Sequence, residues 1–309
     1  MNDVPAESDA SSSPIWRSRL TVLAWRIIAI AARTVPRPVI GPLTRLSGYF
    51  SRIYGRQSRR MARRHQQRVA PDLSNGEVNR LVDDVFARYA QYWIESLRLP
   101  HLDRRRVEHG ITVEGYEHVR EGLAHGRGVI LALPHLGGWE WAGRWLADRG
   151  IEVVAVAERI EPPALFEWMT ALRKRLGIQV VALDASAGTA VLAALKRNAV
   201  VCLLCDRDIQ GGGVEVEFFG EVTTIPAGPA ALAVRTGAAL LPTAVFHTDR
   251  AEGHLGVVMD PIPCDRQGRP LRAAVAEVSA QLASALEDLI RRAPTQWHLL
   301  QPNWGSDRR

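Results

Sequence analysis

Residues 128–142 read GVILALPHLGGWEWA, and this stretch decides the fold. A short apolar run ends at Pro134, and it is followed by His135, Gly137, Gly138 and Glu140. Beyond the second glycine the apolar spacing becomes helical. The stretch therefore predicts a buried strand, a tight turn and the first turn of a helix. Folds of the α/β class place reactive side chains just past the carboxyl end of such a strand.

His135 and Glu140 form an H-x-x-x-x-[DE] pattern. A histidine after a strand is often only structural, but two features favour chemistry here. Gly137 and Gly138 have no Cβ, so another backbone or a substrate can come close. His135 also stands outside the apolar run, where it needs no apolar partner. We therefore treat His135 as a candidate catalytic residue, with Glu140 beside it.

The charge balance indicates an anionic partner. The net charge is +6 and the sequence pI is about 9.7, which suits nucleic acid, phospholipid or a phosphorylated cofactor. The three cysteines are Cys202, Cys205 and Cys264. Cys202 and Cys205 have C-x-x-C spacing, but no second pair exists for a zinc site, and the motif ends a strand instead of opening a helix. We interpret all three as core residues in a reducing cytoplasm.

The N-terminal third is predicted to be helical. Residues 1–14 are expected to be a disordered tail. Residues 15–66 should form helices broken near Pro36, Pro38 and Pro42, and residues 72–97 should form another helix that stops before Pro100. The apolar run at 20–32 is interrupted by Arg26 and is shorter than the roughly 20 residues that a spanning helix needs. It either lies on a membrane surface or packs on the core.

Seven arginines follow this run, between residues 52 and 68: Arg52, Arg56, Arg59, Arg60, Arg63, Arg64 and Arg68. Any one of them is expected on a solvated helix face. As a cluster they suit an anionic membrane surface. Nucleic acid is the rival partner, but the sequence shows no helix-turn-helix, zinc-finger or RNP signature.

From residue 111 strands and helices alternate. The expected strands are 128–133, 152–157, 178–183, 200–204, 239–246 and 255–259, with a further short strand carrying Glu215 and Glu217. The expected helices are 140–149, 163–176, 188–196, 229–236 and 271–292. This alternation predicts an α/β fold with a central, largely parallel sheet covered by helices on both faces. Residues 15–309 are expected to form a single domain, with a mainly helical, membrane-associating part at 15–110 and the α/β core at 111–309.

Polar residues also follow other predicted strands. Glu158 follows the strand at 152–157, and Asp206, Arg207 and Asp208 follow the strand at 200–204. If the sheet is parallel, His135, Glu158 and Asp206 emerge at one edge. A charged turn is the plain alternative for 206–208, but the triplet directly abuts a fully apolar run.

Other chemistries fit the sequence less well. It contains no G-x-S-x-G elbow, phosphate-binding loop or G-x-G-x-x-G after a strand. The nine histidines show no metal-ligand spacing, so no metal is expected. A histidine acting as a general base, with a carboxylate to hold its tautomer, suits attack by a hydroxyl on an activated acyl group without a covalent enzyme intermediate.

An ordered set of motifs now becomes recognisable: YAQYWIESLRLP, HLGGWEWAG, ALRKRLG, CDRD, GVEVEFFGE, IPAGPAALAVRTGAALLP and WHLLQPNW. Together they resemble the bacterial lipid A (lauroyl/myristoyl) acyltransferase superfamily from about residue 50 to 304. Within it, the chain is most similar to the actinobacterial branch that acylates phosphatidylinositol mannosides. Two departures stand out: the family branch usually has S-G-N-W-D where this chain has L-G-G-W-E, and glutamate at the position of Asp206.

The resemblance implies an O-acyltransferase that moves a palmitoyl-like chain from acyl-CoA to a mannose hydroxyl of an anionic glycophospholipid. It implies His135 as the base, Asp206 as its partner and Glu140 as a support of the turn. It also implies that Arg173 faces phosphate or the oxyanion. Further substrate-binding candidates are Glu158, Arg207, Asp208, Gly137 and Gly138.

The resemblance further implies a peripheral enzyme at the cytoplasmic face of the plasma membrane, with no permanently bound cofactor and no nucleic-acid partner. Two alternatives stay open. One is a lipid A-type or other glycolipid acyltransferase, with acyl carrier protein as the donor. The other is a membrane-binding or nucleic-acid-binding protein that uses its basic arm and has only a structural histidine.

Overall fold

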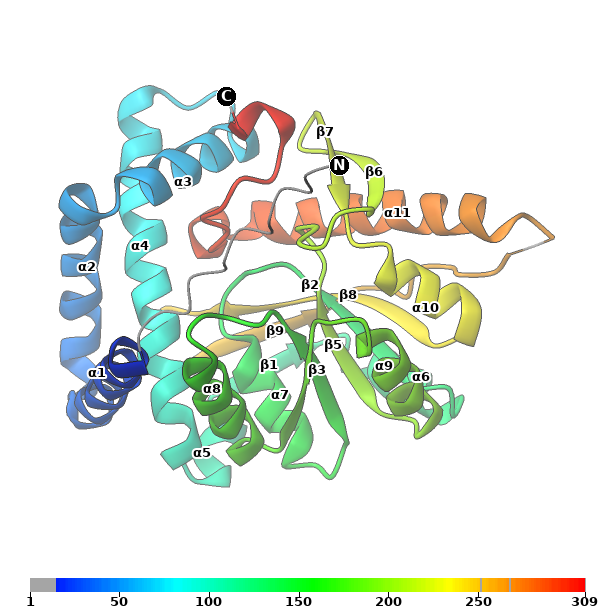
Figure 1. Ribbon diagram of the computed structural model, residues 1–309, viewed down its shortest axis with the longest axis horizontal. Helices are drawn as coiled ribbons and strands as arrows, with labels where there is room; N and C mark the ends of the chain where they lie inside the picture. Colours follow the sequence, from blue (N-terminus) through cyan, green and yellow to red (C-terminus); the bar gives the residue numbers. More distant parts are fainter. Residues whose placement is uncertain (1–14, 251, 267, 309) are drawn as a thin grey trace, which may run out of the picture.

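A seven-stranded, mostly parallel sheet lies at the centre of the protein (Figure 1). The protein is represented by a computed structural model, and the structure describes residues 15–250, 252–266 and 268–308. The sheet strands are β1 (Ile111–Glu114), β2 (Val129–Leu133), β3 (Val153–Ala157), β4 (Ile178–Ala182), β5 (Val200–Leu204), β8 (Ala239–His247) and β9 (His254–Val258). The predicted α/β class is confirmed, while the predicted tail at 1–14 lies outside the described residues.

The strand order is β1-β9-β8-β2-β5-β3-β4. The five strands from β8 to β4 run parallel to one another, whereas β9 is antiparallel to β8 and carries β1 parallel to itself. The strand β1, which has only four residues, was not predicted. One short strand was predicted near Glu215, where the structure has an antiparallel hairpin of β6 (Val214–Phe218) and β7 (Glu221–Ile225).

The central strand β2 is buried along its whole length and contributes side chains to two hydrophobic cores. Ile130 and Ala132 belong to the core on one face, with α9 (Ala187–Lys196), α10 (Gly228–Thr236) and α11 (Leu271–Arg292). The alternate residues belong to the other core, together with α5 (Arg104–His109), α6 (Tyr116–Ala124) and α7 (Trp139–Ala147). The period of two in a strand places alternate side chains on opposite faces, so a wholly apolar run indicates a strand covered on both sides.

Four helices precede the sheet: α1 (Ile15–Thr34), α2 (Arg37–Tyr54), α3 (Arg56–Val69) and α4 (Asn75–Arg98). They stand along one side of the molecule, and α4 contacts the other three (Figure 1). The break predicted near Pro36 is present, but the one predicted at Pro42 is wrong. Pro42 lies inside α2, where it removes one N–H donor near the start of a helix that packs against α4. The chain changes direction at Gly55 instead.

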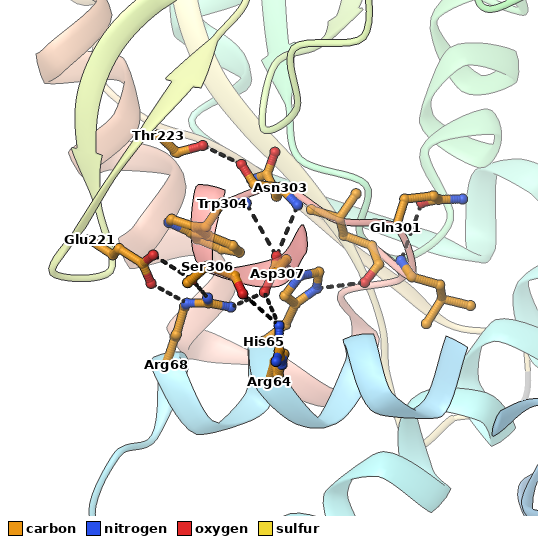
Figure 2. A network of polar contacts seen from close by, with 12 residues as sticks. Arg64, His65, Arg68, Glu221, Thr223, Gln301, Asn303, Trp304, Ser306 and Asp307 are labelled. Carbon is orange, nitrogen blue, oxygen red and sulfur yellow. Dashed lines mark hydrogen bonds and ion pairs between the residues drawn. The ribbon is translucent and has the colours of Figure 1, made fainter. Parts of the chain in front are cut away.

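The arginine cluster is less free than predicted. Members of the cluster have internal partners: Arg52 and Arg59 with Asp83, Arg63 with Asn75 and Asn79, Arg64 with Ser306, and Arg68 with Glu221 and Asp307. Figure 2 shows Arg64, His65 and Arg68 of α3 reaching toward the C-terminal turn η3 (Gly305–Arg308) and the β6–β7 hairpin. A large part of the cluster thus ties α3 to the rest of the protein.

The C-terminal segment passes from α11 back toward the centre of the sheet. It forms isolated β-bridges between Trp297 and Leu136 and between Trp304 and Thr223. Asp307 then accepts hydrogen bonds from the backbone N–H groups of Asn303 and Trp304. The segment is therefore fixed to the turn after β2 and also to the β6–β7 hairpin, and Figure 2 shows the contact with the hairpin.

Candidate active site

Three polar side chains follow neighbouring parallel strands. His135 lies after β2, Asp206 after β5 and Glu158 after β3, and these strands are adjacent in the order β2-β5-β3. His135 Nδ1 lies 2.6 Å from Asp206 Oδ1. The convergence predicted from the parallel sheet is therefore present, and aspartate reaches the histidine despite being one methylene shorter than glutamate.

The turn after β2 is held by backbone hydrogen bonds on two sides. Gly137 has φ +60°, and a Cβ on it would lie 1.8 Å from the carbonyl oxygen of Val245 in β8. Its N–H donates to the Gln296 carbonyl, and the His135 carbonyl accepts from the N–H of His298. Glycine is required at 137 because both the backbone angle and the closeness of β8 exclude a side chain. This fixes where His135 leaves the sheet.

Asp206 is fully buried and accepts three hydrogen bonds. His135 donates from its ring and, at 3.0 Å, from its backbone N–H, while Trp297 Nε1 donates to Oδ2 at 2.7 Å. Burial works to raise the pKa of Asp206, but the His135 charge and these hydrogen bonds outweigh it and lower the pKa. The ionised carboxylate requires a proton on His135 Nδ1, which leaves Nε2 as the basic nitrogen.

His135 lines a cavity of about 740 Å³. Five other predicted site residues line it too: Gly137, Glu158, Arg173, Arg207 and Asp208. Asp206, Glu140 and Gly138 lie behind this lining. Much of the remaining wall is apolar or aromatic, including Trp93, Trp139, Phe166, Met169, Leu183 and Val191. The cavity therefore offers a large apolar surface beside a histidine that is positioned by a carboxylate.

Glu140 was predicted to support the turn by bonding free backbone N–H groups at the start of α7. The bonds that the structure gives it are to other side chains. Glu140 Oε1 accepts from the Tyr92 hydroxyl at 2.7 Å and from Arg173 Nη2 at 3.0 Å. Burial works to lower the pKa of Arg173, and the negative charge of Glu140 more than offsets this, so the pKa is raised. Glu140 thus holds Arg173 at the cavity wall, and it links α4, α7 and α8 (Pro163–Arg175).

The acidic residues at the other strand ends differ in their surroundings. Glu158 is half-exposed and lies 4.0 Å from Arg207 Nη1. Asp208 accepts from the backbone N–H groups of Gly211 and Gly213 at 3.0 and 2.8 Å. Asp208 therefore fixes the glycine-rich loop at the cavity. Glu158 and Arg207 contribute polar groups to the cavity wall.

Several residues at the site were not singled out from the sequence. His298 lines the cavity, and burial, followed by the charges of His247 and His135, lowers its pKa well below the ordinary value. Trp297 and Asn303 contact Asp206, the latter by donating to its carbonyl oxygen at 2.9 Å. The tract WHLLQPNW, residues 297–304, was noted only as part of the family resemblance. Nothing in its composition indicates that it would lie against residue 206.

Cysteine chemistry does not fit the site. Cys202 lines the cavity, but burial, with a smaller effect from the Glu140 charge, raises its pKa to about 12. The thiol therefore stays protonated near neutral pH and is a poor nucleophile. His135, by contrast, presents a partly exposed ring at this wall and has a bonded carboxylate.

The chain is similar to known proteins along most of its length. A family model described as bacterial lipid A biosynthesis acyltransferase matches residues 10–306. A protein from Mycolicibacterium smegmatis named phosphatidylinositol mannoside acyltransferase is 34% identical over 287 residues, covering 92% of this chain and 90% of its own length. A protein of the same name from Mycobacterium tuberculosis is 38% identical over 224 residues, covering 71% of this chain and 68% of its own length.

Proposed function

The chain belongs to the bacterial lipid A biosynthesis acyltransferase family, and on that premise we propose that it transfers a fatty acyl chain from acyl-CoA to a mannose hydroxyl of a phosphatidylinositol mannoside. Family membership makes it an O-acyltransferase. The choice of acceptor is supported by the names of its mycobacterial relatives. The observation that carries the proposal is the His135–Asp206 pair at the wall of a largely apolar cavity.

His135 is the general base in this mechanism. Its Nε2 takes the proton of the mannose hydroxyl as the hydroxyl oxygen attacks the thioester carbonyl carbon. The carbon–sulfur bond then breaks, and the imidazolium gives the proton to the CoA thiolate. An ester and a free thiol result, and His135 is regenerated. Asp206 holds the Nδ1 tautomer and stabilises the transient imidazolium.

Arg173 is proposed to face a phosphate or the developing oxyanion. A guanidinium has five N–H donors, so the bond from Nη2 to Glu140 leaves others for substrate. The Glu140 contact keeps the group in one position before substrate arrives. Arg207 and Glu158, at the same wall, are proposed to bind polar parts of the donor or the acceptor.

A membrane-docking face is proposed on α1 and α2. Besides Ile28, Val39 and Leu43, the exposed apolar side chains there are Leu20, Leu23, Ile27 and Ile30 on α1, and Leu46, Tyr49, Phe50 and Ile53 on α2. Their spacing of three and four places each set on one helix face, while α4 packs against both helices. No helix in the described part of the chain has the length and apolar content to cross a bilayer. We therefore propose peripheral binding to the cytoplasmic face of the plasma membrane.

Vesicle sedimentation tests this face. Replacing Ile27 and Ile30 together with glutamine should weaken binding to phosphatidylinositol vesicles by at least about tenfold, because two large apolar side chains no longer enter the lipid. Val222→Gln is the matched control, since Val222 is equally exposed on β7. Unchanged binding of the double variant would remove α1 from the docking surface.

The function itself is tested by product analysis. The purified chain is incubated with carbon-13-labelled palmitoyl-CoA and a phosphatidylinositol dimannoside, and the lipids are identified by mass spectrometry. We expect a labelled acyl ester on a mannose, with one CoA thiol released per ester formed. Parallel reactions offer a lipid A precursor as the acceptor or labelled palmitoyl-acyl carrier protein as the donor. Label that enters product only in one of these parallel reactions would overturn the proposed substrates and keep the acyl-transfer chemistry.

A further inference from the structure

A second cluster of ionisable side chains lies outside the proposed chemistry. Glu95 of α4, His247 at the end of β8 and His254 at the start of β9 are all buried, and one ligand-type atom of each lies within 4.8 Å of the others. The three positions are too far apart in the sequence to form a metal-ligand motif. The fold brings them together where α4 meets the antiparallel edge of the sheet.

The distances within the cluster match those between metal ligands. Glu95 Oε2 lies 3.2 Å from His247 Nδ1 and 3.0 Å from His254 Nε2. Zinc binds imidazole nitrogen and carboxylate oxygen at about 2.0–2.2 Å, so neighbouring ligand atoms of a tetrahedral ion are roughly 3.3 Å apart. Two imidazoles and one carboxylate are a common zinc ligand set.

The cluster is not satisfied by its own hydrogen bonds. Although Glu95 Oε2 and His247 Nδ1 are close, they are not oriented as a hydrogen-bonded pair, and neither has a hydrogen-bond partner among the described residues. Within that same part of the chain, the ion pairs of Glu95 are those with His247 and His254. A buried carboxylate that faces two imidazoles needs a positive charge close by. A divalent cation supplies that charge and takes up the two unsatisfied atoms.

Neighbouring groups hold the three side chains in place. Glu95 Oε1 accepts from Gln91 Nε2 at 2.8 Å, which leaves Oε2 for the histidines. Gln296 clamps the backbone of His247 by donating to its carbonyl and accepting from its N–H. The ring of Trp141 stacks on His254 with centroids 4.2 Å apart. Ligands that are oriented by outer contacts and shielded by apolar rings are typical of metal sites.

The site would lie directly under the active-site turn. A Cβ on Gly138 would come within 3.0 Å of His254 Nε2 and 3.2 Å of His247 Cε1. The absence of a side chain at 138 thus gives the two imidazoles their space. An ion held here would join α4 and the β8–β9 edge beneath the turn that carries His135, without contacting substrate.

We propose that Glu95, His247 and His254 form a structural site for a divalent transition-metal ion, with zinc as the expected occupant. Glu95 Oε2, His247 Nδ1 and His254 Nε2 are the ligands, and water completes the coordination. The acyl-transfer mechanism does not use this ion. The test needs no activity measurement, so failure of this inference and failure of the proposed function are distinguishable.

Metal analysis of the full chain tests the site. The protein is produced without a histidine tag in zinc-supplemented medium, dialysed against a weak chelator and analysed by inductively coupled plasma mass spectrometry. We expect about one zinc ion per chain. Cobalt(II) added to the metal-free chain should give visible d–d absorption that saturates at about one equivalent, and zinc should abolish it. Less than about a tenth of an equivalent of zinc, together with no cobalt absorption, would overturn the proposal.

Two variants identify the ligands. Glu95→Gln and His254→Gln should each weaken zinc binding by at least about tenfold. His65→Gln is the matched control, because His65 is also a buried histidine but lies outside the cluster. Retention of zinc by both ligand variants would overturn the assignment. If neither variant folds, the cobalt titration of the wild-type chain still decides the question.

Discussion

Among the described residues, two histidine–aspartate pairs with a buried aspartate have similar composition and different surroundings. In the first, His135 Nδ1 contacts Asp206; in the second, His65 Nε2 lies 3.2 Å from Asp307 Oδ2 (Figure 2). Both aspartates are buried, but the His135 side chain is 28% exposed and that of His65 only 1%. The second ring nitrogen of His65, Nδ1, is also occupied, because it is hydrogen-bonded to the Leu299 carbonyl. A histidine–aspartate pair can act as a base only where the ring keeps a free nitrogen at a cavity.

The two pairs are also connected. His65 lies against the rings of Trp297 and Trp304, with centroids 5.3 and 5.1 Å apart, and Trp297 donates to Asp206. The buried pair His65–Asp307, here called the inner pair, therefore supports the C-terminal segment. Through Trp297 this segment in turn helps to hold the outer pair, His135–Asp206. We expect changes at His135 to affect turnover and changes at His65 to affect stability first.

The largest expected effect separates the two histidines. His135→Ala should reduce acyl transfer by about 10²–10⁴-fold, the usual contribution of a general base, and leave the melting temperature nearly unchanged. His65→Ala should lower the free energy of unfolding by about 1–3 kcal/mol, because it removes the buried contacts of the His65 ring with the Leu299 carbonyl and with Asp307 Oδ2. Product assays and urea unfolding on both variants make the comparison. Equal losses of turnover in the two variants would contradict it.

A smaller effect is expected at the two tryptophans between the pairs. Trp297→Phe removes the Nε1 hydrogen bond to Asp206 and should lower kcat about five- to tenfold. The acidic limb of kcat/KM should move to higher pH, because Asp206 with one donor fewer holds the imidazolium more strongly. Trp304→Phe is the matched control: it is as buried, but its Nε1 donates to the Phe218 carbonyl. If both variants shift the pH profile alike, Trp297 acts only through packing.

The smallest effect concerns the contribution of Asp307, in the inner pair, to the stability of the protein in acid. Burial works to raise the pKa of Asp307, but the hydrogen bonds from His65 and from the Asn303 and Trp304 N–H groups outweigh it and lower the pKa. A carboxyl with a lowered folded pKa stabilises the protein above its ordinary pKa, about 3.9. That contribution is lost as the pH falls through the folded value.

Asp307→Asn cannot titrate, so the variant should lose less stability than wild type between about pH 6 and pH 3. Its stability near neutral pH should be lower than that of wild type. Urea unfolding at several pH values measures both effects. Parallel pH curves for the two proteins would show that Asp307 does not contribute to acid sensitivity.

The sheet and its reactive edge could be predicted because their signals are local. The apolar run ending at Pro134 indicates a doubly covered strand, and parallel order then brings His135 and Asp206 to one edge. The antiparallel pairing of β9 with β8 was not predicted, although the connection at 248–253 is too short for a parallel crossover. The strand β1, which pairs parallel to β9, was missed because it has only four residues. Pro42 was misread because packing against α4 outweighs one lost hydrogen bond.

The hydrogen-bond partners of the site residues could be identified only from the fold. Glu140 bonds Tyr92 and Arg173, and Trp297 reaches Asp206 across 91 positions. Such pairings depend on how α4 and the C-terminal segment pack, and they have no fixed spacing. The same holds for Glu95 with His247 and His254, which no search for spaced ligands would find.

The pH dependence of kcat/KM tests most directly whether the exposed pair is the catalytic one. Wild type, His65→Gln and His135→Gln are assayed with the same acyl-CoA and acceptor over a range of about pH 5 to 9, which contains the usual histidine pKa. We predict that wild type and His65→Gln lose activity together as the pH falls, whereas the small residual activity of His135→Gln shows no such acidic limb. An acidic limb that survives in His135→Gln would show that another group is the base, and would contradict the account.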